Sequence, residues 1–180
     1  MVIHMGKNRI SPRTRRLTAG AAFVALGVLM LWLGAVVEVL DLSLAALASI
    51  LTVIAVIEFG GGFPWAVWAA TSVLSLLLLP AKFPALLYLL FMGIYPMLKT
   101  AFEGCRPVFA WLLKLSAFNT ALLLLIVVCT YVLALPDTGM TMSVVVFALG
   151  NGAFLLYDIA LSRLILLYLF KLRPRFRIGR

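Results

Sequence analysis

Three polar side chains that could bind a ligand by hydrogen bonding lie within otherwise apolar stretches of the chain: Asn119, Asn151 and Asp158. Asn151 and Asp158 are seven residues apart in the sequence. Seven residues make about two helical turns, so both side chains fall on one face of a helix. An ionisable side chain inside an apolar segment is costly to bury and is therefore a candidate for function. We expect Asp158 to be paired, hydrogen-bonded, protonated or in contact with water.

Asn119 and Asp158 belong to two successive apolar segments, 109–135 and 142–170, joined by a turn at 136–139. We expect these segments to be antiparallel helices. Asn119 then lies ~16 Å, and Asp158 ~20 Å, from the inner ends of their helices. This similar depth predicts a hydrogen bond between Asn119 and Asp158. The bond can be interpreted as a clamp between the helices, worth about 0.6–2 kcal/mol, or as part of a ligand cavity.

A base, Arg163, shares the last apolar segment with Asp158. At ~100° per residue, the two side chains point about 140° apart, so we do not expect them to pair with each other. Arg163 lies ~12 Å from the inner end of the segment, and its long side chain can extend to the membrane interface.

The elements that must position these residues are apolar helices. The chain is 65% apolar and 12% charged, with a mean hydropathy of +1.18, whereas soluble domains are about half apolar and a quarter charged. We predict an all-α, polytopic membrane protein with one domain, 17–170, between basic tails at 1–16 and 171–180. Its six transmembrane helices are expected at 17–37, 42–57, 65–79, 84–98, 109–135 and 142–170. The third, at ~23 Å, is short for a bilayer.

The basic residues predict the orientation of these helices. With the N-terminus in the cytoplasm, six spans return the C-terminus there, and Lys82 is the one base left in an outer loop. Such an excess of bases on one side follows the positive-inside rule. The bases assigned to the cytoplasmic side are Lys7, Arg9, Arg13, Arg15, Arg16, Lys99, Arg106, Lys171, Arg173, Arg175, Arg177 and Arg180.

The sequence lacks the motifs of several enzyme classes. His4 is its only histidine, which argues against most zinc sites and every histidine-dependent triad. It has no Gly-x-x-x-x-Gly-Lys-Ser/Thr phosphate loop and no Gly-x-Ser-x-Gly. We expect no catalytic residue, no metal and no cofactor. The net charge of +9 is attributed to membrane topology, and no nucleic-acid partner is expected.

Small residues form stripes on the first predicted helix. Gly20, Gly27 and Gly34 recur every seven residues, and Ala21 and Ala25 form a patch to one side. Such stripes let membrane helices approach closely. They predict either packing of the first two helices on each other or docking to a partner membrane subunit.

These features resemble the substrate-binding S components of energy-coupling factor vitamin transporters. The points of likeness are six spans in about 180 residues, basic ends inside, the Ala21-x-x-x-Ala25 patch, and an acid followed by small residues in 41–49. The resemblance implies a bacterial cytoplasmic-membrane protein that binds a small molecule and docks through Ala21 and Ala25 to a transmembrane subunit driven by ATPases. In this interpretation Asn119, Asn151 and Asp158 bind the ligand. The same general fold also resembles the rod-shape membrane protein of the cell-wall machinery, which would make this chain a scaffold.

Overall fold

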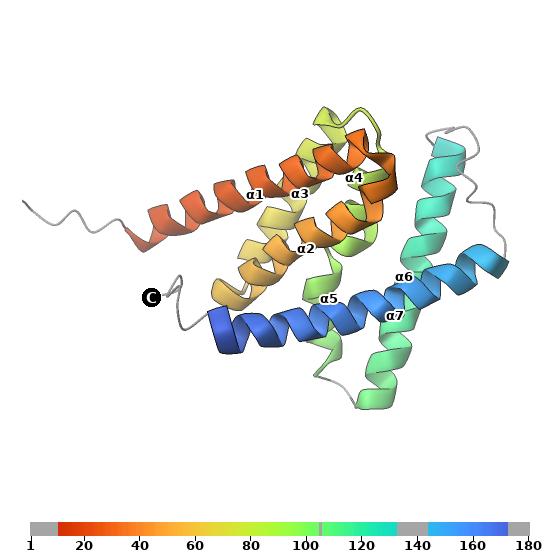
Figure 1. Ribbon diagram of the computed structural model, residues 1–180. Helices are drawn as coiled ribbons and strands as arrows, with labels where there is room; N and C mark the ends of the chain where they lie inside the picture. The colour runs from red at the N-terminus through yellow and green to blue at the C-terminus, as the bar shows by residue number, and fades with distance from the viewer. Residues whose placement is uncertain (1–10, 105, 133–143, 173–180) are drawn as a thin grey trace, which may run out of the picture.

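The computed structural model describes residues 11–104, 106–132 and 144–172, and these parts of the chain are helical with short connections (Figure 1). This confirms the predicted all-α class. The α-helices are α1 (Pro12–Val36), α2 (Asp41–Glu58), α3 (Phe63–Leu78), α4 (Phe83–Leu87), α5 (Tyr95–Phe102), α6 (Pro107–Val127) and α7 (Val144–Leu167). A 3₁₀ turn, Glu38–Leu40, precedes α2, and π-helical turns follow α4 (Tyr88–Met92), α6 (Val128–Val132) and α7 (Tyr168–Leu172).

Five helical stretches of the described chain are long and apolar enough to cross a membrane: Arg13–Val36, Asp41–Glu58, Phe83–Phe102, Pro107–Tyr131 and Val144–Lys171. The remaining predicted span, the third, corresponds to α3, which has 16 residues. At ~1.5 Å per residue it is about 24 Å long, as short as the sequence predicts. The predicted turn at 136–139 and most of both predicted tails lie outside the described residues.

Helix α1 begins five residues before the predicted span. Ser11 caps it, because its hydroxyl accepts a hydrogen bond from the backbone N–H of Thr14 at 3.2 Å. Pro12 occupies the first turn, where its missing N–H has no helical partner to lose. The basic residues Arg13, Arg15 and Arg16 therefore belong to the helix and not to an irregular tail.

The stretch Phe83–Phe102 is a broken helix. The short α4 runs into a π-helical turn, and α5 starts only at Tyr95, with Pro96 in its first turn. At the break, a Cβ on Gly93 would lie 2.6 Å from Trp68 and 2.7 Å from the Tyr88 ring. A larger residue at position 93 would collide with these two rings. Glycine therefore allows the rings to pack closely against the broken part of the helix.

The predicted fourth span ended too early. We expected it to stop at 98 and the next span to start at 109, but α5 continues to Phe102 and α6 starts at Pro107. Lys99 is therefore a buried residue of α5, with 2% of its surface exposed, and not a base in a cytoplasmic loop. The charge of Lys99 suggested a loop, but its ion pair with Asp158 allows it to lie in a buried helix.

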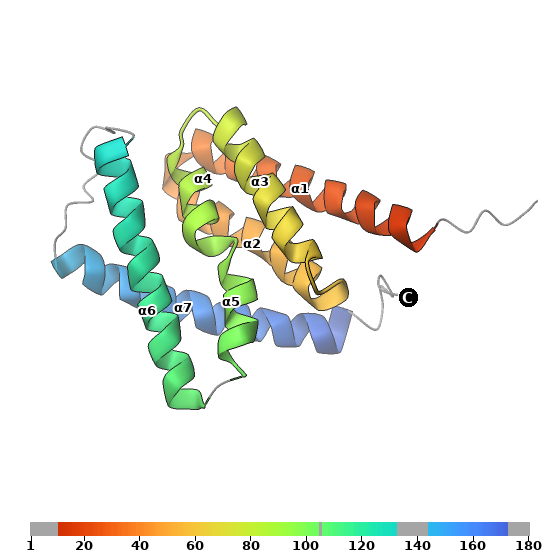
Figure 2. The ribbon, with the colours of Figure 1, turned by 180° about the vertical axis from the view of Figure 1, so that it is seen from behind.

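The glycine stripe of α1 packs inside the molecule. A Cβ on Gly27 would lie 3.0 Å from Thr71 of α3, and one on Gly20 would lie 3.2 Å from Phe63. Helix α1 packs against both α2 and α3. Figure 2 shows these three helices on one side of α4 and α5, with α6 on the other. This outcome supports internal packing for the glycines and extends it to α3.

Helix α7 crosses α6 obliquely and does not run alongside it (Figure 1). Contacts between the two helices are recorded at Asn119 and Asn151 and at Gly150, which lies next to Phe118 and Leu122. Helix α7 also packs against α2, so it bridges α6 and the α1–α3 group.

Candidate functional site

Asp158 lies in a buried cluster of charges formed by three helices. Lys99 of α5 and Lys114 of α6 both pair with its carboxylate, the latter at 3.2 Å. The Tyr95 hydroxyl donates a third hydrogen bond to it at 2.6 Å. Asp158 is 3% exposed and the two lysines are 2% and 6% exposed. Of the four alternatives expected for Asp158, the structure shows two: it is ion-paired and hydrogen-bonded.

Two further residues complete this cluster. Glu103, half exposed at the end of α5, lies 3.0 Å from Lys99 and 3.2 Å from Lys114. Lys99 also donates to the Ser162 hydroxyl at 2.9 Å. Two ammonium groups thus face two carboxylates, and the charges balance. A buried cluster of this kind adds little net stability over apolar packing, but removing one member is costly because it leaves a buried charge unpaired. We call Tyr95, Lys99, Glu103, Lys114, Asp158 and Ser162 the ion cluster.

The predicted hydrogen bond between Asn119 and Asp158 is wrong. Asn119 instead pairs reciprocally with Asn151, through two amide hydrogen bonds of 3.0 Å each. Each amide also donates to a carbonyl of its own helix, Asn119 to Leu115 and Asn151 to Phe147, both at 2.8 Å. The amides therefore clamp α6 to α7, as one of the two interpretations proposed, but with a different partner.

The register of the two helices explains this error. The helices cross, so they meet over only a short length: Asn119 meets Asn151, and Asp158, seven residues further along α7, meets Lys114. Lys114 lies five residues, a little over one turn, before Asn119 on α6. Depth measured from predicted span ends could not supply the register, because those ends were uncertain by several residues. Of the three residues expected to bind a ligand together, the structure pairs two and places the third in the ion cluster.

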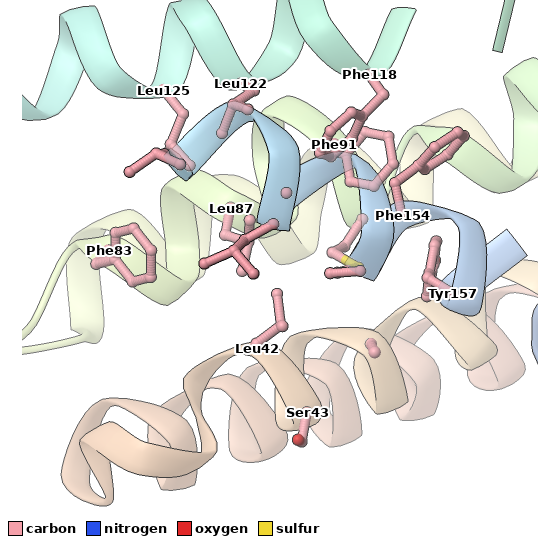
Figure 3. Close-up of a pocket in the computed structure, with 16 residues that line it drawn as sticks. Leu42, Ser43, Phe83, Leu87, Phe91, Phe118, Leu122, Leu125, Phe154 and Tyr157 are labelled. Carbon is pink, nitrogen blue, oxygen red and sulfur yellow. The ribbon is translucent and has the colours of Figure 1, made fainter. Parts of the chain in front are cut away.

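A cavity of about 490 Å³ lies beside the ion cluster, among α2, α4 with its π-helical turn, α6 and α7. Its size is typical of small-molecule sites. Figure 3 shows Leu42, Leu87 and Leu122 on several sides of it, with the rings of Phe91, Phe118 and Phe154 grouped together. The 16 lining residues are Leu42, Ser43, Ala46, Phe83, Leu87, Phe91, Met92, Phe118, Leu122, Leu125, Val146, Leu149, Gly150, Ala153, Phe154 and Tyr157. None of them is charged.

Aromatic rings separate this cavity from the ion cluster. Phe118 stacks on Phe154 with centroids 4.8 Å apart, and Phe91 meets both rings edge-on at 5.1 and 5.7 Å. The Tyr95 ring packs behind them, 5.5 Å from Phe154, and its hydroxyl reaches Asp158. Tyr95 therefore joins the two features: its ring supports the aromatic floor of the cavity, and its oxygen belongs to the ion cluster.

The predicted docking residues Ala21 and Ala25 are exposed on α1 and line a second hollow. This groove, about 530 Å³, lies between α1 and α3. The side facing the two alanines is formed mainly by Phe63, Ala66, Val67, Ala70 and Leu74 of α3. Small residues lie on both sides of the groove, Ala21 and Ala25 on α1 and Ala66 and Ala70 on α3, as they do where membrane helices approach closely. The groove includes Gly20 at one end of the glycine stripe, whereas Gly27 and Gly34 are buried.

Sequence reasoning missed Lys99, Lys114 and Tyr95 as partners of Asp158. One signal was available: an acid deep in a membrane span needs a base at its own depth, and Lys114 lies within an apolar segment. The cavity had no such signal, because it depends on the break after α4 and on the crossing of α7 over α6.

The site consists of an apolar cavity beside a balanced set of buried charges, and such a cavity can hold a ligand by apolar contact. The described part of the chain contains no group of three or more His, Cys, Asp or Glu side chains placed to hold a metal. No protein-family model, no curated protein and no solved structure matches the chain. The likeness to S components therefore rests on the sequence pattern alone.

Proposed function

We propose that this chain is the membrane-embedded substrate-binding subunit of an energy-coupling-factor-type uptake system in a bacterial cytoplasmic membrane. It crosses the membrane six times, with α3 as the short span and both ends in the cytoplasm. The chain itself performs no catalysis. It binds a small molecule and relies on a transmembrane coupling subunit and ATPases for energy.

The observation that carries the proposal is the position of the cavity. Its lining comes from the start of α2 (Leu42, Ser43), the start of α4 (Phe83) and the first half of α7 (Val146, Leu149). In the predicted orientation these helix ends face outward, so the cavity occupies the outer half of the bundle. An uptake subunit needs its binding site on that side. The cavity residues Phe91, Phe118 and Phe154 therefore replace Asn119, Asn151 and Asp158 as the proposed ligand contacts.

The groove between α1 and α3 supports the second half of the proposal. Ala21 and Ala25 are exposed in a chain whose other small-residue stripe is already used for internal packing. We assign this groove to the coupling subunit. The ion cluster then has a structural role, because it ties α5, α6 and α7 together beneath the cavity.

Affinity purification of the tagged chain from the membranes of its source organism tests this assignment. We expect the wild-type chain to recover one further polytopic protein together with ATPase subunits. The double substitution Ala21→Leu and Ala25→Leu fills the groove and should remove them. Ala22→Leu is the matched control, since Ala22 is equally exposed on α1 and is not among the lining residues of the groove.

Two results would overturn the proposal. One is recovery of cell-wall or cytoskeletal proteins without any ATPase, which is the outcome for a scaffold. The other is unchanged recovery of the same partners by the Ala21/Ala25 variant when its elution profile and thermal stability match those of the wild type.

A further inference from the structure

The lining of the cavity is almost entirely apolar. Among the described residues that line it, only Ser43 and Tyr157 have a side-chain polar atom that can hydrogen-bond strongly. The charges of Lys99, Lys114 and Asp158 lie behind the aromatic floor and are bound to one another. Lys82, next to the lining residue Phe83, donates to the carbonyls of Leu76 and Leu79. No charged side chain is among the described residues that line the cavity.

The hydroxyl hydrogen of Tyr157 is already used. Ser49 donates its own hydrogen to the Ala46 carbonyl at 2.6 Å, so the 2.8 Å contact between the Ser49 and Tyr157 oxygens requires Tyr157 to be the donor. Ser43 is exposed, and in Figure 3 its oxygen lies on the side away from the labelled rings. The cavity thus offers a ligand almost no hydrogen-bond donor.

This composition determines which ligands can bind. A charged group transferred into such a site without a partner would lose several kcal/mol or more of solvation free energy, and an unpaired amide or hydroxyl about 1–3 kcal/mol. A flat hydrocarbon ring has no polar group and loses no such solvation free energy. It can also stack against the ring faces and edges of Phe91, Phe118 and Phe154.

The lining also indicates how such a ligand reaches the cavity. Leu42, Leu149 and Ala153 line it and are exposed on the surface of the described chain, Leu149 to 70%. The cavity is therefore open at a surface made of apolar side chains, the kind of surface that faces lipid in a membrane protein. A compound dissolved in the outer part of the bilayer can enter without crossing a polar barrier.

From these features we propose that the cavity binds a neutral, membrane-soluble ring compound, and not a charged or phosphorylated one. The inference rests on the proposed function and narrows it: the substrate of this uptake subunit is a lipophilic ring compound. Members of the resembled family are expected to take up vitamins in general, and the cavity restricts this chain to the uncharged, apolar end of that range.

Binding of matched probes to the purified protein in nanodiscs tests the proposal. The probes are 2-naphthol, which is neutral at pH 7, and naphthalene-2-sulfonate, which carries the same ring with a negative charge. Decanol represents an alkyl chain. Equilibrium dialysis against empty nanodiscs corrects for partition into lipid. We expect saturable binding of 2-naphthol and at least tenfold weaker binding of the sulfonate and of decanol.

A variant pair shows whether binding occurs in this cavity. Ala153→Phe should fill it from α7 and weaken 2-naphthol binding at least tenfold. Ala160→Phe places the same ring on the same helix, at an exposed position that is not among the lining residues, and should bind like the wild type. Because Ala153 is exposed, its substitution does not overpack the core. An unchanged melting temperature verifies that the variant folds. Ala153→Leu is a milder variant that fills less of the cavity.

Equal or tighter binding of the sulfonate would overturn the neutral-ligand proposal. Tighter binding of decanol would show a lipid-chain site instead, and unchanged 2-naphthol binding in Ala153→Phe would place the ring elsewhere.

These outcomes are separable from failure of the proposed function. If the ring compound does not bind but the coupling subunit and ATPases are still recovered, the ligand class alone is wrong. If the ring binds and no ATPase is recovered, the cavity assignment stands and the uptake role fails.

Discussion

Replacement of Asp158 is the most informative perturbation of the fold. Asp158→Ala leaves the ammonium groups of Lys99 and Lys114, which are 2% and 6% exposed, with Glu103 as their remaining carboxylate. Removing one partner of a buried ion pair typically costs 3–5 kcal/mol, and we expect a loss of about that size. Asp158→Asn keeps an oxygen that can accept from the Tyr95 hydroxyl, but it lacks the charge, so we expect it to be almost as destabilising.

Reversible unfolding of the detergent-solubilised chain by increasing fractions of sodium dodecyl sulfate, followed by tryptophan fluorescence, measures these changes. Glu103→Gln is the control: it removes a carboxylate from the same two lysines, but this carboxylate is 51% exposed. Since exposed pairs contribute about 0.2–1 kcal/mol, its cost should be much smaller than that of Asp158→Asn.

A double-substitution cycle tests the pairing itself. Lys99→Met combined with Asp158→Leu removes one charge of each sign and leaves Lys114 with Glu103 at 3.2 Å. The double variant should be more stable than the sum of the two single changes predicts, by about 0.5–3 kcal/mol. A loss below about 1 kcal/mol for Asp158→Asn, together with additive energies in the cycle, would refute the reasoning, because it would mean that the charges are solvated and not mutually dependent.

The remaining predictions concern other contacts. Asn119→Ala should cost about 0.6–2 kcal/mol, and Asn151→Ala should add little once Asn119 is absent, because their two 3.0 Å bonds are shared; additive losses in the unfolding assay would contradict the pairing. Gly93→Ala should destabilise by about 1–3 kcal/mol through overpacking, since its Cβ would meet Trp68 at 2.6 Å. Gly152→Ala on α7, where a Cβ meets nothing within 4 Å, should be neutral or stabilising as the helix propensity of alanine predicts, and equal effects at both glycines would count against the described break.

The helices could be predicted from the sequence because apolar length is a local property. The six apolar runs, the shortness of α3 and the turn at Gly60 and Gly61, both with φ of +57°, all follow from residues close together in the chain. The prediction of the partner of Asp158 was wrong because that partner is not a local property of the sequence. The partner depends on where α7 crosses α6, and only about one helical turn of α6 separates Asn119 from Lys114.

Lys99 shows the same limit. In the sequence it looks like a base after the end of a span, but Asp158, 59 residues away, keeps it within a buried helix. The cavity was equally hidden, because Phe91, Phe118 and Phe154 come from three elements that meet only through the break after α4. The small-residue pattern of α1 was readable in part: it indicated close packing but not that the glycines face α2 and α3 while Ala21 and Ala25 remain exposed.

The central claim is that the cavity lies in the outer half of the membrane, and labelling of single cysteines in intact cells tests it most directly. In a background with Cys105→Ser and Cys129→Ala, Ser43→Cys lies at the cavity and Arg106→Cys at the start of α6, both at exposed positions. We predict that a membrane-impermeant maleimide labels Ser43→Cys from outside, and labels Arg106→Cys only after the membrane is permeabilised. Labelling of Arg106→Cys in intact cells, with Ser43→Cys protected until permeabilisation, would place the cavity on the cytoplasmic side and contradict the proposed uptake function.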